Sequence, residues 1–218
     1  TKNVSTVISN GLLIGISLLA VVPLVYMFSL SLQTMQQVIG AGGIIPSPFT
    51  LEAYVAVFTR MPFLLYLRNT LTITTATLIG TVISNCLGAY GFARFRFPGR
   101  EIIFTVLLSS MMLPGVVRLI PTYILFQKLG WVNTFLPLVV PAYFGSAFFV
   151  FLLRQFFRQI PEDLFDAAKI DGCGELMTLV WIALPSVQPA LITMLIFSFQ
   201  GSWNDFMGPL IYLKSAEL

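Results

Sequence analysis

The chain has 218 residues, of which 57% are hydrophobic and only 10% are charged, and its net charge is +3. Soluble domains carry roughly 25% charged residues, so this composition disfavours a soluble protein. The chain contains no histidine, which excludes most metal sites and histidine-based catalysis. Its scattered basic residues suit membrane topology signals better than a nucleic-acid surface, so we expect no metal site and no nucleic-acid partner.

Long uncharged intervals predict the membrane spans. Each of four intervals is long enough for the about 20 apolar residues that cross a bilayer core. These intervals cover residues 3–51, 69–93, 129–153 and 176–204. A fifth span is expected after Glu101, as a helix to about residue 126 that is kinked because Pro114 and Arg118 interrupt it. The sequence thus predicts an all-α polytopic membrane protein with at least five transmembrane helices.

The basic residues predict the orientation of these spans. Arg94, Arg96 and Arg100 form the densest basic cluster, and basic residues favour the cytoplasmic side. Alternation from this cluster places the N-terminus and the segment after Arg154 in the cytoplasm. Seven basic residues then lie on the cytoplasmic side and five outside, a difference that rests mainly on the cluster.

The first two spans and their connection have distinct patterns. The first span is expected over residues 7–32, an apolar run longer than the 7–15 residues of a signal-peptide core. In the connection, Thr50 can cap an amphipathic helix over residues 51–58, which either lies on the membrane or contacts an external partner. The second span, over residues 69–92, is rich in Thr, Ser and Gly, and such residues favour close packing between membrane helices.

An acidic segment over residues 161–185 interrupts the apolar second half of the chain and holds five of the nine acidic residues. Pro161 suits the first position of a helix, and Glu162 and Asp163 place negative charge at the positive end of its dipole. Gly172 suits a left-handed helix end. The segment therefore begins with a short helix over residues 161–171.

One face of this short helix is apolar and shallow, and it combines Leu164, Ala167, Ala168 and Asp171. Such a ridge is suited to docking into a groove of another protein, although a solvated loop packed on the bundle remains an alternative. A second helix follows the glycine, with apolar residues at helical spacing: Cys173, Leu176, Met177, Val180, Trp181 and Leu184. It is expected to act as a lever and to join the fifth span at Pro185.

These residues also form a known pattern. Asp166-Ala167-Ala168, then Gly172, then Ile182-Ala183-Leu184-Pro185 resembles the EAA loop of bacterial ABC importer permeases, with aspartate in place of the usual glutamate. The run A-A-K-I-D-G resembles the carbohydrate branch of that family, the maltose-type permeases. Further similar runs cover nearly the whole chain: S-L-Q-T, R-N-T, A-Y-G-F-A-R, L-P-G, F-F-R-Q-I-P and S-W-N-D-F.

The resemblance implies a permease subunit that moves a sugar, oligosaccharide or related polyol into the cytoplasm of a bacterium across its inner membrane. The cytoplasmic two-helix EAA loop would dock into a separate ATPase. We assign this coupling to Glu162, Leu164, Asp166, Ala167, Ala168, Asp171, Gly172, Leu184 and Pro185. The family architecture implies a single permease domain over residues 1–218 and a sixth transmembrane helix, before which this sequence ends.

The expected partners follow from the same resemblance. The chain has no G-x-x-x-x-G-K-[ST] phosphate loop, so it is not expected to be an enzyme or to bind a cofactor. ATP and Mg²⁺ would bind to a dimer of the ATPase subunit. A second homologous permease, an extracytoplasmic solute-binding protein and membrane lipid complete the set of expected partners.

Sugars are bound by hydrogen bonds and aromatic stacking, which suggests side chains for the substrate pathway. The candidates are Asn69, Tyr143, Ser146, Gln200, Trp203 and Asn204. Trp203 could instead be an interfacial aromatic residue, and Asn204 a helix cap. An ion-driven secondary transporter is the alternative function, but the long spans lack the ionisable residues it would use. An intramembrane enzyme is disfavoured because G-x-S-x-G and H-E-x-x-H motifs are absent.

Overall fold

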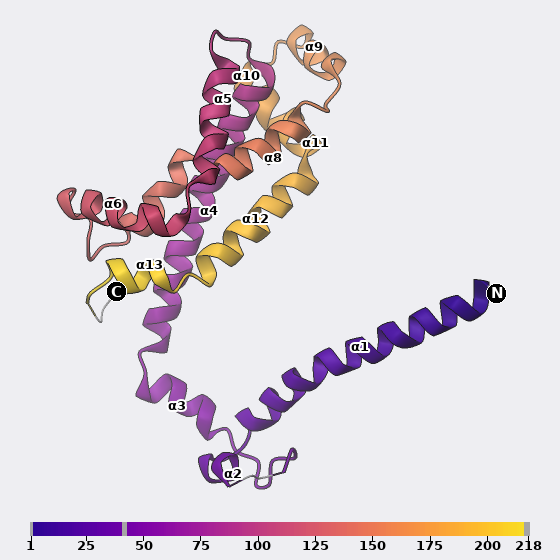
Figure 1. Cartoon of the computed structure of the whole chain (residues 1–218), viewed down its shortest axis with the longest axis vertical. Helices are drawn as coiled ribbons and strands as arrows, with labels where there is room; N and C mark the ends of the chain where they lie inside the picture. Colours follow the sequence, from indigo (N-terminus) through magenta and orange to yellow (C-terminus); the bar gives the residue numbers. More distant parts are fainter. Residues whose placement is uncertain (1, 41–42, 216–218) are drawn as a thin grey trace. The chain divides into compact units, whose positions relative to one another are not determined.

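The computed structural model describes residues 2–40 and 43–215, except for the side chains of residues 2–5, 7 and 8. The side chain of Lys2, which the orientation prediction uses, therefore lies outside the described part. The chain divides into two compact units, residues 1–66 and residues 67–218, which are described separately (Figure 1). A single permease domain over residues 1–218 remains a prediction.

The first unit contains the first predicted span and the amphipathic helix. Helix α1 (Lys2–Ser31) includes an apolar stretch, Ser9–Ser31, long enough to cross a membrane, and its side chains from residue 9 to 28 are all exposed. Helix α2 (Met35–Ile39) starts with a capping box between Thr34 and Gln37. Helix α3 (Glu52–Arg60) begins one residue later than expected, and the hydroxyl of Thr50 accepts the N–H of Glu52 at 3.1 Å.

The second unit is organised around α4 (Phe63–Arg94), which begins just before the boundary between the units. Helices α8 (Ala147–Phe157) and α12 (Gln188–Trp203) pack along it. The side chains that α4 buries are mostly small or polar: Asn69, Thr74, Thr81, Asn85, Cys86, Ala89 and Tyr90. This confirms that the second span is a packed helix.

The predicted number of spans agrees with the helices found in the described residues. Three stretches can each cross a membrane as they stand: Ser9–Ser31, Phe63–Arg94 and Leu136–Phe157. The third comprises α7 (Leu136–Val139), a 3₁₀ turn (Val140–Phe144) and α8. Two bent helix pairs raise the total to five if each pair forms one span.

The first bent pair replaces the expected kinked helix. Helix α5 (Arg100–Ser109) continues into a 3₁₀ turn (Ser110–Met112), and α6 (Gly115–Lys128) leaves at 102°. The break is sharper than a kink because Pro114 has no N–H to continue the helix and holds Leu113 in an extended conformation.

The second bent pair corrects the predicted start of the fifth span. After α9 (Glu162–Ile170), a helix runs through α10 (Glu175–Thr178), a π-helical stretch (Leu179–Ala183) and α11 (Leu184–Ser186). Helix α12 then leaves at 86°. The expected junction at Pro185 is wrong, because Pro185 fits within the first turn of α11 and the chain leaves helical geometry only at Val187. The last helix of the described residues is α13 (Met207–Tyr212).

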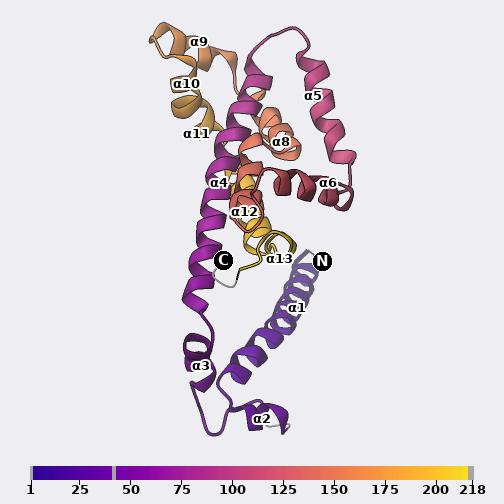
Figure 2. The ribbon, with the colours of Figure 1, turned by 90° about the vertical axis from the view of Figure 1, so that its left-hand side faces the viewer.

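The hydrophobic core of the second unit lies at the Arg94 end of α4. It combines side chains from α4, α5, α8, α9, the π-helical stretch and α12, including Tyr90, Phe104, Leu153, Phe157, Phe165, Leu179, Ala183, Val187 and Met194. Both views show α9 and α10 at this end of α4 (Figures 1 and 2). The acidic segment is therefore part of the core structure, not a peripheral loop.

Candidate functional site

Helix α9 has one face turned into the protein and one face turned outward. Phe165 and Ala168 are each only 2% exposed, whereas Ile170 is 86% and Leu164 is 45% exposed. Asp166, Ala167 and Asp171 are also exposed. The outward face thus keeps most of the residues assigned to coupling, but the expected accessibility of Ala168 is wrong, because Ala168 lies three residues after Phe165, on the face that is turned into the core.

Phe165 fixes α9 to the end of α4. The guanidinium of Arg94 lies over the Phe165 ring at 3.6 Å, and it also forms an ion pair of 3.7 Å with Glu162. The ring of Tyr90 lies beside Phe165, and the Tyr90 hydroxyl donates to Oε2 of Glu175 at 3.0 Å. Both helices of the acidic segment are therefore held by α4.

Gly172 forms the predicted corner after α9. Its φ of +79° lies in the left-handed region, which favours glycine. The N–H of Cys173 donates to the carbonyl of Ala168 at 2.9 Å, and the N–H of Gly172 donates to that of Lys169 at 3.1 Å. These two bonds form a Schellman motif, so the turn between α9 and α10 has a defined geometry.

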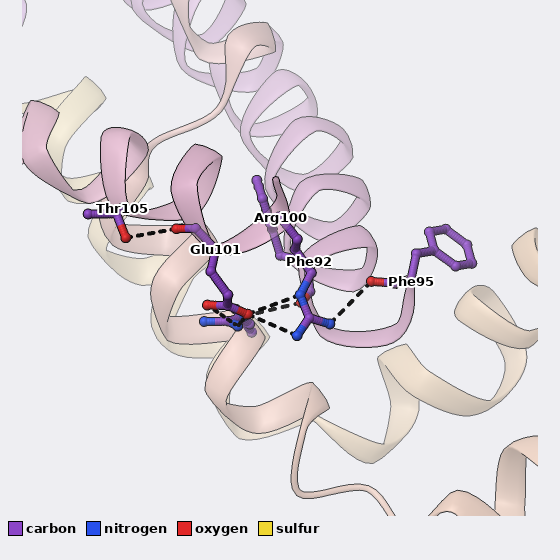
Figure 3. Close-up of polar contacts among 6 residues, drawn as sticks. Phe92, Phe95, Arg100, Glu101 and Thr105 are labelled. Carbon is purple, nitrogen blue, oxygen red and sulfur yellow. Dashed lines mark hydrogen bonds and ion pairs between the residues drawn. The ribbon is translucent and has the colours of Figure 1, made fainter. Parts of the chain in front are cut away.

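A charged clamp stabilises the same end of the unit. The carboxylate of Glu101 accepts hydrogen bonds from Arg100 and Arg154, each at 3.0 Å (Figure 3). Arg154 is only 5% exposed, donates to the carbonyl of Phe92 at 3.2 Å and lies 3.9 Å from the Phe104 ring. Through these contacts Arg154 joins α8 to both α4 and α5.

The apolar face predicted for the second helix of the acidic segment exists, but it faces away from the described protein. Leu176, Met177, Val180 and Trp181 are exposed, and Trp181 is 73% exposed. The opposite side, with Leu179 and Ala183, enters the core. Of the two assigned residues here, Leu184 is half-buried and Pro185 is exposed.

A cavity of about 370 Å³ lies between α4 and α12 in the second unit. Its lining includes Thr70, Thr77, Leu138, Phe149, Ser198, Ser202, Trp203 and Asp205. Among the six predicted pathway residues, only Trp203 lines this cavity. The hydroxyl residues were missed as pathway candidates, although threonines on α4 and serines on α12 recur at helical spacing.

Three other pathway candidates have structural contacts. The ring of Tyr143 packs against Gly80, so closely that a Cβ atom there would lie 2.5 Å from it. The N–H of Ser146 donates to Oδ1 of Asn85 at 2.7 Å. Asn69 is buried in α4.

The remaining two candidates lie at the end of α12. Asn204 follows the helix and donates its Nδ2 to the carbonyl of Gln200 at 3.0 Å, which agrees with the helix-cap alternative. The side chain of Gln200 is exposed and does not line the cavity.

Hydroxyl pairs hold α4 and α12 together near this cavity. Ser198 donates to Thr81 at 3.2 Å, and Ser202 donates to Thr74 at 3.3 Å. Ser84 donates to the carbonyl of Ala142 at 2.8 Å. The predicted packing role of the small polar residues in α4 is confirmed for these positions.

Comparisons with known proteins identify the family. Residues 76–216 match the family described as "Binding-protein-dependent transport system inner membrane component". The chain belongs to this family.

The most similar proteins include permeases of named sugar uptake systems. The diacetylchitobiose uptake system permease protein NgcG of Streptomyces coelicolor is 31% identical over 93% of this chain and 67% of its own length. The arabinooligosaccharides transport system permease protein AraQ of Halalkalibacterium halodurans is 30% identical over 100% of this chain and 80% of its own length.

A solved structure shares the fold. A chain in the crystal structure of a bacterial ABC transporter involved in the import of the acidic polysaccharide alginate superimposes with a TM-score of 0.87. It is 25% identical, and the match covers 96% of this chain and 75% of that chain.

The protein is therefore a membrane-embedded permease subunit of an ABC importer, and its resemblance to the carbohydrate branch is confirmed. It is a transport component and not an enzyme, because the ATPase of such importers is a separate subunit. It functions with that ATPase and with a solute-binding protein. An ion-driven secondary transporter is not favoured.

Proposed function

We propose that this permease carries a carbohydrate and is driven through the loop of residues 161–185. Relatives named for diacetylchitobiose and arabinooligosaccharides support a carbohydrate substrate. The cavity between α4 and α12, lined by hydroxyl groups and the indole of Trp203, suits a neutral polyol that is bound by hydrogen bonds and stacking.

The proposed arrangement follows from the charges. The Arg94 end of α4, the acidic segment and the N-terminus face the cytoplasm, where the ATPase dimer binds ATP and Mg²⁺. A second homologous permease lies beside this chain in the membrane. This chain itself binds no cofactor.

The observation that carries the coupling role is the division of α9 into two faces. Its inward face is fixed by Phe165 and Arg94, and its outward face exposes Leu164, Asp166, Ala167 and Ile170. A helix that is held firmly on one side and apolar on the other suits docking into a groove of the ATPase.

The route from this helix to the cavity is short. Movement of α9 passes through the Gly172 corner to the helix of residues 175–186, which is ordered and enters the core through Leu179 and Ala183. Val187 then connects it to α12, whose far end lines the cavity with Ser202 and Trp203. Displacement of α9 would therefore tilt α12 relative to α4.

The test is charge reversal on the outward face. In the complete importer, Asp166→Lys combined with Asp171→Lys should reduce co-purification of the ATPase subunit at least about tenfold, because the two carboxylates would no longer make close charge contacts with the ATPase. Solute uptake should fall in parallel. Membrane insertion should be unchanged. The matched control is Glu52→Lys, an exposed carboxylate on α3. Normal co-purification and uptake in the double variant would exclude the docking role.

A further inference from the structure

A strongly basic pocket lies at the Arg94 end of α4, between the turn into α5, the end of α8 and the start of α9. Its volume is about 280 Å³. Four arginines line it: Arg94, Arg96, Arg100 and Arg158. The coupling role described above uses only one of them, Arg94.

Two of these arginines are compensated by carboxylates, and two are not. Arg94 pairs with Glu162 at 3.7 Å, and Arg100 pairs with Glu101 at 2.9 Å. Within residues 2–40 and 43–215, the side chains of Arg96 and Arg158 form no ion pair or hydrogen bond. Two like charges that face one pocket repel each other, so a bound anion would stabilise this arrangement.

The chemistry of the pocket favours a phosphate group. Guanidinium groups bind phosphate oxygens through paired hydrogen bonds, which gives both affinity and a defined geometry. Phe157 and Ile160, both buried, also border the pocket.

The position of the pocket favours a lipid as the source of that phosphate. It lies directly at the ends of two membrane-crossing stretches, Phe63–Arg94 and Leu136–Phe157, where headgroups are found. A neighbouring hollow of about 430 Å³ shares Arg96 and Arg100 with it and is also lined by Phe97 and Ile102. An acyl chain can lie against these apolar side chains while its headgroup reaches the arginines.

We propose that this pocket binds the phosphate of an anionic phospholipid headgroup. Basic pockets between membrane helices bind such headgroups in general. The proposal requires only that α4 and α8 cross the bilayer, so it does not depend on the coupling role of α9.

The test measures lipid binding to the purified importer complex by native mass spectrometry. The complex is titrated with phosphatidylglycerol or phosphatidylcholine, in the presence or absence of excess inorganic phosphate. We expect Arg96→Gln combined with Arg158→Gln to weaken phosphatidylglycerol binding about 30-fold, because each arginine near an anionic surface contributes a factor of about five. The matched control, Arg60→Gln combined with Arg118→Gln, should bind like the unmodified complex.

The outcomes separate the possible occupants. Preferential binding of phosphatidylglycerol that persists in inorganic phosphate and is lost in the double variant supports the proposal. Equal binding of both lipids, or displacement of the lipid by inorganic phosphate, overturns the lipid assignment. Unchanged lipid binding with reduced ATPase co-purification would identify the pocket as an ATPase contact and would also overturn it.

A second variant guards against loss of assembly. Arg96→Lys combined with Arg158→Lys keeps both charges but loses the paired hydrogen bonds, so we expect a smaller loss of affinity, about threefold to tenfold. Phosphatidylglycerol binding equal to that of the unmodified complex in this variant would show that charge alone is recognised and would contradict the proposed guanidinium–phosphate geometry.

Discussion

The two ends of the contact between α4 and its neighbours are built differently. At the Arg94 end, large aromatic rings are buried together with an arginine over each of two rings, at Phe165 and Phe104. Toward the cavity, α4 and α12 are joined by hydroxyl pairs of 3.2 and 3.3 Å and by small side chains. The first region buries much apolar area, whereas the second depends on weak polar contacts.

This difference indicates how the unit can transmit movement. Buried rings resist separation because each ring would lose its packing contacts and expose its apolar surface to water. Hydroxyl pairs between membrane helices contribute only about 0.6 kcal/mol each on average. The Arg94 end is thus suited to move as one body with α9, and the contact near the cavity is suited to open and close.

The largest expected effect comes from removing the buried ring of α9. Phe165→Ala should destabilise the purified importer by about 3–5 kcal/mol, because it creates a cavity in the core and removes the surface on which Arg94 stacks. The loss of stability is measured by thermal unfolding, with the loss of monodisperse importer complex as the signal. Phe144→Ala, which removes a ring that is 83% exposed, is the matched control and should change stability by less than about 0.5 kcal/mol.

Equal stability of the two variants would mean that α9 is not anchored through Phe165. The Arg94 end of α4 would then not be the firmer of the two contacts. The proposed route from α9 to α12 would lose its support at the same time.

Much of the outward face of α9 could be predicted from the sequence, but its anchor could not. Pro161, Glu162 and Gly172 carry local signals for a helix start and end, and the structure has α9 between them. Phe165 and Ala168 are also three residues apart, but this spacing alone does not reveal which side of an amphipathic helix is buried. That choice depends on Arg94 and Tyr90, more than 70 positions away in the chain.

The substrate pathway was harder to predict for a related reason. Residue type alone suggests single polar residues such as Tyr143 and Ser146, but these two have packing and backbone contacts. The cavity is formed where α4 and α12 meet, and its position depends on the break at Val187, after which α12 leaves at 86°. Proline predicts that a helix is interrupted, but not the angle at which the next helix leaves.

An intermediate effect is expected at the close approach of Tyr143 to α4. Gly80→Ala places a Cβ atom 2.5 Å from the Tyr143 ring, so the ring or the backbone must move, and we expect a loss of about 1–3 kcal/mol in stability. Gly91→Ala, on the same helix with open space at its Cβ position, is the control and should be neutral or slightly stabilising. Thermal unfolding of both variants in the importer complex measures the difference, and equal values would contradict the close packing.

The smallest expected effect concerns the hydroxyl pairs between α4 and α12 near the cavity. In a double-mutant cycle, Thr81→Val and Ser198→Ala should show a coupling energy of about 0.6 kcal/mol, because the two hydroxyls share one hydrogen bond within the membrane. The control pair is Thr81→Val with Ser186→Ala, whose hydroxyl bonds within its own helix and should show no coupling. Transport should be retained in every variant. A contact between α4 and α12 that opens and closes during transport cannot depend on one strong hydrogen bond. A coupling energy above about 2 kcal/mol would instead make the contact between α4 and α12 as firm as the packing at the Arg94 end. The movement that opens the pathway would then have to occur elsewhere.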